Sequence, residues 1–140
     1  NPLRRELLTT KWPHGVIGID IDTGVVRQVC RFNAWHPMVS RDGARMVADT
    51  TFPDIGLQLF DPSNGVGDPD LLCLSGSSNE GRHWDTDHCP YDDGPVDVFA
   101  PQHTHPHPNF SPDGSLVVFS SDRSGYAQLY ECQLPVAFNL

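Results

Sequence analysis

The sequence predicts an all-β chain, and three observations lead to that fold class. Twelve glycines and thirteen prolines among 140 residues separate short apolar runs, which is typical of strands joined by turns. The stretch HPMVSRDGARMVADT, which begins at His36, matches HPNFSPDGSLVVFSS, which begins at His107, at a constant offset of 71. Downstream, Gln58–Phe60 matches Gln128–Tyr130 after a one-residue slip. We count about eight strands and no convincing amphipathic helix.

Tight turns separate the predicted strands. Asp42–Gly43 and Asp113–Gly114 each follow a serine and precede alternating apolar residues, which is a strong hairpin signal. Thr23–Gly24 joins VIGIDID to VVRQVC, and Pro62–Gly65 follows LQLFD. Both halves of the repeat are therefore predicted to run as strand, turn, strand, loop and strand.

Repeats of one four-stranded unit predict the blades of a β-propeller. A blade of the commonest type has about 40–45 residues, so the offset of 71 exceeds one blade. We assign the surplus to an inserted loop over residues 75–102, which is polar, contains scattered aromatic residues and shows little strand pattern. Loops of such length are usually functional or disordered.

The chain supplies too few blades to close a ring. Propellers close with typically about 4–8 blades, whereas residues 1–140 provide about three. We therefore expect one partial propeller domain of antiparallel four-stranded sheets, an incomplete propeller. The chain is expected to be the C-terminal part of a longer protein, or a protomer that completes its ring by self-association, because unpaired edge strands invite aggregation.

The charge of the chain excludes some partners. Eighteen acidic residues against nine basic ones give a net charge of −9, and nucleic-acid binding needs the basic patches that are missing here. No apolar run approaches the length of a membrane span, and NPLRRELLTTKWP lacks the apolar core of a signal peptide. We expect a cytoplasmic protein, in which a bound cation would help to attract an acidic ligand.

The four cysteines, at positions 30, 73, 89 and 132, form no C-x-x-C pair, so a zinc ribbon is not expected. Cys30 and Cys132 lie in apolar, strand-like runs and are predicted to be small core residues. Free thiols in a reducing compartment are favoured over a disulfide framework.

The stretch QHTHPHPNF, which begins at Gln102, indicates a metal site. In an extended chain the side chains at i and i+2 point the same way, so His105 and His107 can face one ion, and the proline after each restricts φ. If equivalent strands begin neighbouring blades, His36 approaches the same point. Imidazole and amide donors without thiolate suit manganese, iron or another divalent ion better than structural zinc.

Each of these residues also has an interpretation without metal. His105 and His107 would fit a histidine-rich surface loop, and His36 alone would fit a hydrogen-bonded residue at the start of a blade. His103 is expected to be a solvated loop residue and His14 a turn residue.

Two stretches resemble known families. SPDGSLVVFSSDRSGYAQLYECQLP, which begins at Ser111, resembles a blade of the TolB-like propellers, where an S-P-D-G hairpin is followed by an S-D-R-x-G turn. The run QHTHPHPNFSPDG, together with the separate HP at His36, more specifically resembles the metal-binding segment of oligogalacturonate lyases, which are intracellular enzymes built on a seven-bladed propeller. The resemblance spans roughly residues 15–135.

The resemblance implies a Mn²⁺ site. In that family a glutamine and two histidines, arranged as Q-x-x-H-x-H, bind the ion with a third histidine that opens an earlier blade. These positions correspond to Gln102, His105, His107 and His36. The resemblance also implies β-elimination of pectin-derived oligogalacturonides, in which loss of the proton on C5 leads to an unsaturated uronate. A divalent ion bound to the uronate carboxylate would stabilise the charge that develops there.

The resemblance assigns no catalytic base to this chain. In the resembling enzymes the base and the acid are an arginine and a histidine from blades that precede the first metal-binding histidine. Counting back from His36 by that kind of separation goes past Asn1, so the resemblance matches no residue of this chain to either role. Arg82 and His83 of the inserted loop are the remaining catalytic candidates. We expect a metal-binding segment with little or no lyase activity.

The stretch HWDTDH could also bind a metal by itself, and Trp84 and Tyr91 could stack on a sugar ring, while Asp85, Asp87 and His88 could equally be solvated.

Three other functions are considered. A non-catalytic TolB-like binding module would retain negligible metal and would be insensitive to EDTA. A metal-dependent hydrolase would form no conjugated double bond in its product. The propeller of a serine peptidase is disfavoured because no G-x-S-x-G motif is present.

Overall fold

The computed structural model describes residues 1–51, 53–63, 67–78 and 104–135, which form ten strands and no helix. The prediction of an all-β fold is confirmed. It follows that the described part of the chain contains no helix of the length and hydropathy that a membrane crossing requires. The strand count exceeds the expected one because short strands of two or three residues, such as Met38–Val39 (β4), are included.

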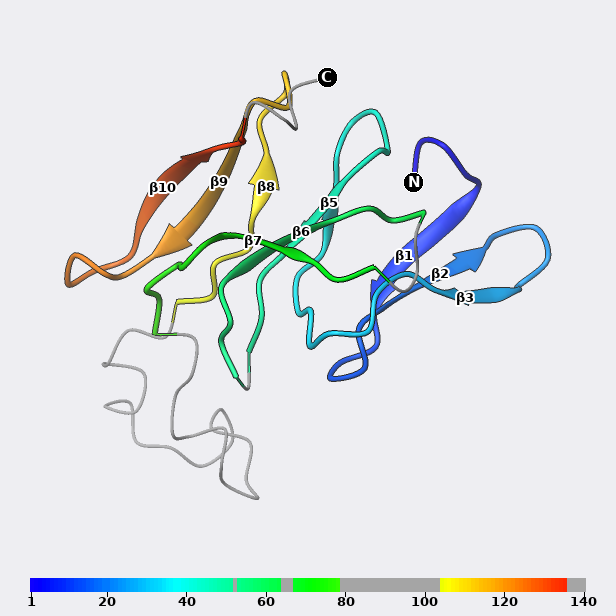
Figure 1. Ribbon diagram of the computed structural model, residues 1–140, viewed down its shortest axis with the longest axis horizontal. Coiled ribbons are helices and arrows are strands. Elements are labelled where there is room, and N and C mark those ends of the chain that lie inside the picture. The colour runs from blue at the N-terminus through cyan, green and yellow to red at the C-terminus, as the bar shows by residue number, and fades with distance from the viewer. Residues whose placement is uncertain (52, 64–66, 79–103, 136–140) are drawn as a thin grey trace.

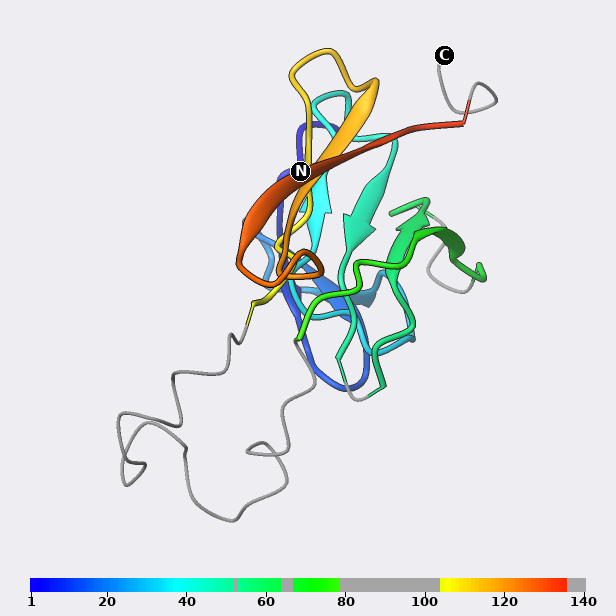
Figure 2. The same ribbon diagram turned by 90° about the vertical axis from the view of Figure 1, so that its left-hand side faces the viewer.

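Three antiparallel sheets follow one another across the molecule (Figure 1). Only the second has the predicted four strands within the described residues, and the other two have three each, as in an incomplete propeller. The first sheet is β1 (Glu6–Thr10), β2 (Val16–Asp20) and β3 (Val26–Gln28); the second is β4, β5 (Met46–Ala48), β6 (Leu57–Phe60) and β7 (Asp70–Cys73); the third is β8 (Asn109–Phe110), β9 (Leu116–Ser121) and β10 (Gln128–Gln133). Figure 2 shows the third sheet nearest the viewer.

The second and third sheets share one strand register. Met38 pairs with Val47 between β4 and β5, and Asn109 pairs with Val118 between β8 and β9, so both partners are displaced by 71 positions. The glycines of the two Asp–Gly turns have φ values of 75° and 71°. Glycine adopts this left-handed conformation without steric cost, so both hairpins reverse at the same point of the repeat.

The predicted match between Gln58–Phe60 and Gln128–Tyr130 is wrong by two residues. Phe60 pairs with Met46, whereas Cys132 pairs with Val117, the repeat equivalent of Met46. Phe60 therefore corresponds to Cys132. A shift of two residues leaves the same side chains on the same face of a strand, which is why the apolar pattern did not reveal it.

Two hydrophobic clusters fill the spaces between the three sheets. Alternate side chains of β5 point to opposite faces, so Met46 and Ala48 join the first cluster and Val47 joins the second. A strand that is buried on both faces has a continuous apolar sequence, as β5 does. The first cluster contains Val16, Val29, Cys30, Ala34, Met46, Ala48 and Phe60; the second contains Val47, Leu57, Leu59, Val117, Phe119 and Leu134.

The cysteines differ in burial. Cys30 is buried in the first cluster, as predicted. Cys132 is only half-buried, because β10 lies at the outer edge of the third sheet and its side chain packs against the rim of the second cluster. Cys73 is likewise half-buried at that rim, and Cys89 lies outside the described residues.

Candidate metal centre

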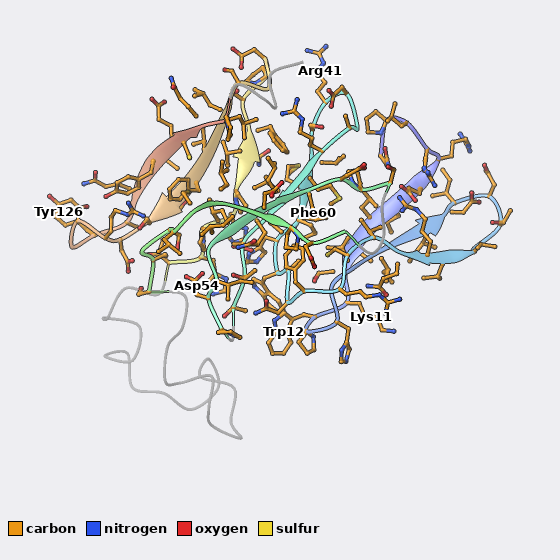
Figure 3. The ribbon with its side chains drawn as sticks, viewed as in Figure 1. Lys11, Trp12, Arg41, Asp54, Phe60 and Tyr126 are labelled. Atoms are coloured by element: carbon orange, nitrogen blue, oxygen red, sulfur yellow. The ribbon has the colours of Figure 1, made fainter. Side chains whose placement is uncertain are left out.

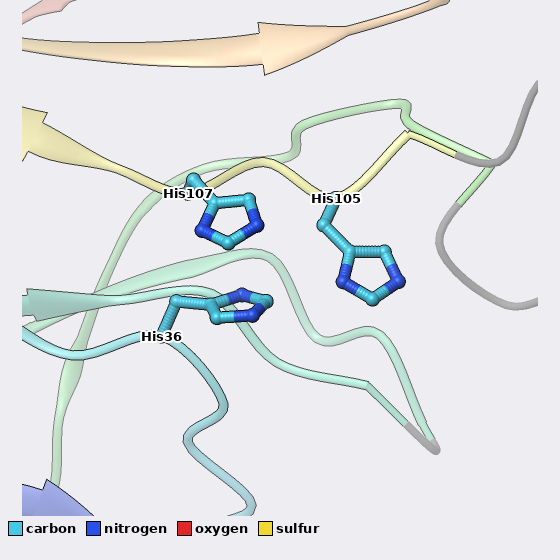
Figure 4. A group of neighbouring side chains, drawn as sticks. All are labelled: His36, His105 and His107. Carbon is cyan, nitrogen blue, oxygen red and sulfur yellow. The ribbon is translucent and has the colours of Figure 1, made fainter.

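Three histidines from two neighbouring sheets lie together (Figure 4). His36 precedes β4 and His107 precedes β8, each by two positions, and His105 lies two residues earlier on the second of these segments. One ring nitrogen from each of the three lies within 4.8 Å of the other two. The register that the second and third sheets share thus brings equivalent blade-start residues to one place.

The three imidazoles are packed against one another. The ring centroids of His36 and His107 are 3.6 Å apart with an interplanar angle of 27°. The centroid of His105 lies 5.3 Å from that of His36 and 5.9 Å from that of His107. His36 and His105 are half-buried and His107 is exposed, so the cluster can be reached by a ligand from solvent.

The backbone at His107 is in a left-handed conformation, with φ at 44°, alone among the non-glycine residues that the structure describes. The predicted extended geometry is therefore wrong at this residue. The two flanking prolines are fully buried, and the Pro106 carbonyl accepts a hydrogen bond from Ser120 N at 2.8 Å. Anchoring on both sides maintains a conformation that costs about 1–2 kcal/mol for an L-residue.

Asp49 connects the two histidine-bearing segments. Its carboxylate is 2% exposed and lies 2.8 Å from His36 Nδ1. The same carboxylate accepts hydrogen bonds from the backbone N–H groups of His36, at 2.7 Å, and of His107, at 3.1 Å. When Nδ1 of His36 donates to Asp49, the lone pair of its Nε2 is left available for a metal ion.

Asp49 was missed by the sequence reasoning, although the repeat held a signal for it. ADT at residues 48–50 aligns with FSS at residues 119–121, so Asp49 stands where the other repeat has Ser120. A carboxylate at the end of a buried strand, in one repeat only, departs from the shared pattern.

The surroundings of His107 favour its neutral imidazole. Burial lowers the pKa of His107, and repulsion from a charged His36 lowers it further, against the opposing effect of Asp49. Metal ions bind the neutral form of histidine, so a lowered pKa leaves the ligand competent at lower pH.

Aromatic side chains extend from the cluster towards the first sheet. Trp35 contacts His36 edge to face at a centroid distance of 5.5 Å, and Trp12 contacts Trp35 in the same way at 5.5 Å. Trp12 is 40% exposed, and Figure 3 shows it at the same edge of the molecule as Asp54. These tryptophans were not among the predicted site residues.

Several predicted residues fall outside the described part of the chain. They are Gln102, the catalytic candidates Arg82 and His83, His103, and the remaining residues of HWDTDH with Tyr91. His14 is described and is exposed in the turn between β1 and β2, where its backbone N–H donates to Lys11 O at 2.7 Å.

The histidine cluster fits a divalent metal ion. Nitrogen ligands lie about 2.0–2.1 Å from a bound ion, so two of them are at most about 4.2 Å apart. The observed limit of 4.8 Å needs only small side-chain rotations to reach that value. Three imidazoles, one of them oriented by a buried carboxylate, are a suitable donor set for manganese, iron or zinc.

Comparison with known proteins gives structural relatives alone. No family model and no curated protein matches the chain. Among solved structures, an oligogalacturonate lyase in complex with manganese is 28% identical with a TM-score of 0.62, and the match covers 88% of this chain and 29% of that one. An oligogalacturonate lyase from Vibrio parahaemolyticus is 23% identical with a TM-score of 0.60, covering 88% of this chain and 30% of that one.

A third structure widens the comparison to another propeller. TolB from Acinetobacter baumannii is 16% identical with a TM-score of 0.58, and the match covers 92% of this chain and 26% of that one. These likenesses confirm the predicted resemblance to oligogalacturonate lyases and TolB-like propellers, and the fold as part of a β-propeller. The chain spans less than a third of the length of each of these proteins.

Proposed function

We propose that this chain provides the metal site of a lyase that cleaves oligogalacturonides, the acidic oligosaccharides derived from pectin, by β-elimination. The observation that carries the proposal is the convergence of His36, His105 and His107 from two neighbouring sheets, with ligand atoms within 4.8 Å. The structural likeness to an oligogalacturonate lyase in complex with manganese supports it.

The donor set supports Mn²⁺ as the ion, and we propose the cytoplasm as the compartment. Imidazole without thiolate is compatible with manganese, and Gln102 is proposed as a further oxygen ligand. Asp49 would hold His36 in the tautomer that presents Nε2, because its carboxylate lies 2.8 Å from Nδ1. The stacked contact with His107, at 3.6 Å between centroids, restricts the ring from the other side.

The reaction requires the proton on C5 of a uronate to be removed while negative charge develops on a carboxylate that is already ionised. A bound divalent ion would supply Lewis-acid stabilisation of that charge. Residues of this chain would contribute position: the exposed side of His107 leaves room for the carboxylate, and the buried Asp49 keeps the two segments together. The ion would also offset the net charge of −9, which repels an acidic saccharide.

We assign neither the base nor the acid to a described residue. Arg82 and His83 remain candidates outside the described residues. The proposal therefore predicts metal binding by this chain together with little or no elimination when it is assayed alone.

Metal content tests the proposal. The purified chain is loaded with Mn²⁺, dialysed and measured by elemental analysis beside a His105→Ala/His107→Ala variant and a His14→Ala control. We expect one ion per chain in the parent and in the control, and none in the double variant. Equal metal in all three proteins would refute the site.

The reaction type is tested separately. Elimination creates a conjugated double bond that absorbs ultraviolet light, whereas a hydrolase using a metal-bound water produces no such absorbance. The assay uses oligogalacturonide with the chain and with a longer protein that contains it. Metal-dependent absorbance from the longer protein supports the lyase, and hydrolysis without absorbance would replace it. A chain that retains no metal fits instead a non-catalytic propeller module.

A further inference from the structure

Two cysteines meet where the second and third sheets face each other. Cys73 lies on β7 and pairs with Leu57, and Cys132 lies on β10 and pairs with Val117. Leu57 and Val117 are fully buried members of the second hydrophobic cluster, and both cysteines pack against that cluster. Burial raises the pKa of the Cys73 thiol, and the Cys132 thiol is near enough to Cys73 to raise that pKa further.

The seam between these sheets is held in place near Cys73. Arg123 Nε and Ser121 Oγ each donate to Ser75 O at 2.8 Å, two residues after Cys73. Ser78 N donates to Asp122 Oδ1 at 2.9 Å. These bonds join the segment after β7 to the end of β9 and the turn that follows it, so they hold the second and third sheets together close to Cys73.

We propose that Cys73 and Cys132 form a site of oxidative modification, at which thiol–disulfide exchange with a low-molecular-weight disulfide joins β7 to β10. The proposal is independent of the metal site and of the lyase reaction. In β-propellers neighbouring blades are held by side-chain packing, and this bridge would add a covalent link between two of them.

The exchange takes place in two balanced steps. The Cys132 thiolate attacks a disulfide such as oxidised glutathione, which forms a mixed disulfide and releases one glutathione thiolate. The Cys73 thiolate then attacks the Cys132 sulfur, and the second glutathione leaves as thiolate. Two protein thiols and one oxidised glutathione become one protein disulfide and two glutathione thiols, with the protons of the protein thiols passing to the leaving groups.

The order of the steps follows from the surroundings of Cys73. Burial, together with the neighbouring Cys132, raises the pKa of Cys73 to about 12, and Arg123 acts in the opposite direction. Cys73 is therefore a poor first nucleophile, since only the thiolate reacts. Once Cys132 is part of a mixed disulfide it carries no charge and no longer raises the pKa of Cys73. Arg123 still lowers that pKa.

The other two cysteines allow a controlled experiment. Cys30 is buried in the first cluster, away from the seam, and burial raises its pKa to about 11. It serves as an internal control that should keep its thiol. Cys89 lies outside the described residues, so every protein in the experiment carries Cys89→Ser.

The experiment incubates the folded Cys89→Ser protein with oxidised glutathione, followed by thiol counting in denaturant and mass spectrometry of peptides. We expect the loss of two thiols and a cross-linked peptide pair containing Cys73 and Cys132. A further Cys73→Ser change should leave a glutathione adduct on Cys132, whereas in Cys132→Ser the adduct on Cys73 should form more slowly, because the burial of Cys73 remains. Retention of all thiols, or a bridge that involves Cys30, overturns the proposal.

Thermal unfolding of the Cys89→Ser protein, in which Cys73 and Cys132 are both intact, gives a readout that needs no change at either of these two cysteines. The bridge would close a segment in which the cysteines are 59 positions apart, and restriction of the unfolded chain grows with loop length. We expect the oxidised protein to unfold several degrees higher, and dithiothreitol to reverse the shift. An unchanged or lowered Tm shows that the seam does not accommodate the bond and contradicts the proposal.

Discussion

The second and third sheets contain the same repeat but contribute differently to the histidine cluster. His36 and His107 occupy equivalent positions, 71 apart, and the strand registers that follow them agree. The second sheet adds a buried carboxylate, Asp49, where the third has Ser120. The third adds a left-handed backbone at His107. The repeat thus brings the ligands together, and departures from the repeat orient them.

The largest expected effect comes from removing a ligand that the repeat supplies. His36→Ala should lower the affinity for Mn²⁺ by more than about 100-fold, beyond the effect of losing an outer partner. Isothermal titration measures it, with His14→Ala as the matched control because that histidine lies in an exposed turn. Unchanged affinity in His36→Ala would remove this residue from the site.

Exchanging the residue that distinguishes the two sheets should have the next largest effect. Asp49→Asn keeps the size of the side chain but places an amide against His36 Nδ1, which disfavours the tautomer that presents Nε2. We expect a loss of about 10–100-fold in Mn²⁺ affinity. Ser120→Ala, at the equivalent position, should leave the affinity unchanged. Equal losses from both substitutions would mean that Asp49 has no orienting role.

The backbone difference between the two histidines can be measured without metal. At His107, where φ is 44°, glycine should be more stable than alanine by about 1–2 kcal/mol, because only the L-residue is strained there. At His36 the order should reverse, since glycine has greater freedom in the unfolded chain. The free energy of unfolding in urea is measured without metal for His107→Gly, His107→Ala, His36→Gly and His36→Ala. The same order of stability of the glycine and alanine variants at both positions would contradict the strained backbone at His107.

The smallest effect concerns the two Asp–Gly turns. Asp42 and Asp113 each accept a hydrogen bond from the serine two residues earlier, but Asp113 also accepts one from the Ser115 hydroxyl, where the other turn has Ala44. The pKa of Asp113 is lowered to about 2, first by Ser111 and then by Ser115, and that of Asp42 is also lowered.

A lowered carboxyl pKa in the folded state stabilises the protein above the unfolded value of about 3.9. That contribution is lost as the pH falls from about 4 towards 2. Ser115→Ala should raise the pKa of Asp113 towards that of Asp42, and Ala44→Ser should lower the pKa of Asp42. Carboxyl carbon shifts measured by NMR against pH test this. Identical titration of Asp113 with and without Ser115 would contradict it.

Much of the fold was predictable because the repeat and its turns are local signals. Asp42–Gly43 and Asp113–Gly114 predicted two hairpins that share one register. The correspondence between β6 and β10 in the repeat was predicted two residues out of place, since a shift of two preserves the buried face. The convergence of His36 with His105 and His107 followed from the same repeat.

Other parts of the site depend on packing that no local pattern encodes. The left-handed conformation of His107 arises because the prolines beside it are buried and its N–H reaches Asp49, a residue 58 positions away. Cys73 and Cys132 likewise pack against one cluster only because two sheets face each other. Spacing along the chain carried no indication of either.

The most direct test of a metal ion shared by the two sheets is NMR with substoichiometric Mn²⁺, which broadens protons close to the bound ion. The account predicts selective loss of the ring-proton signals of His36, His105 and His107, while those of His14 stay sharp. Broadening of His14 to the same extent, or sharp signals from the three clustered imidazoles, would contradict it.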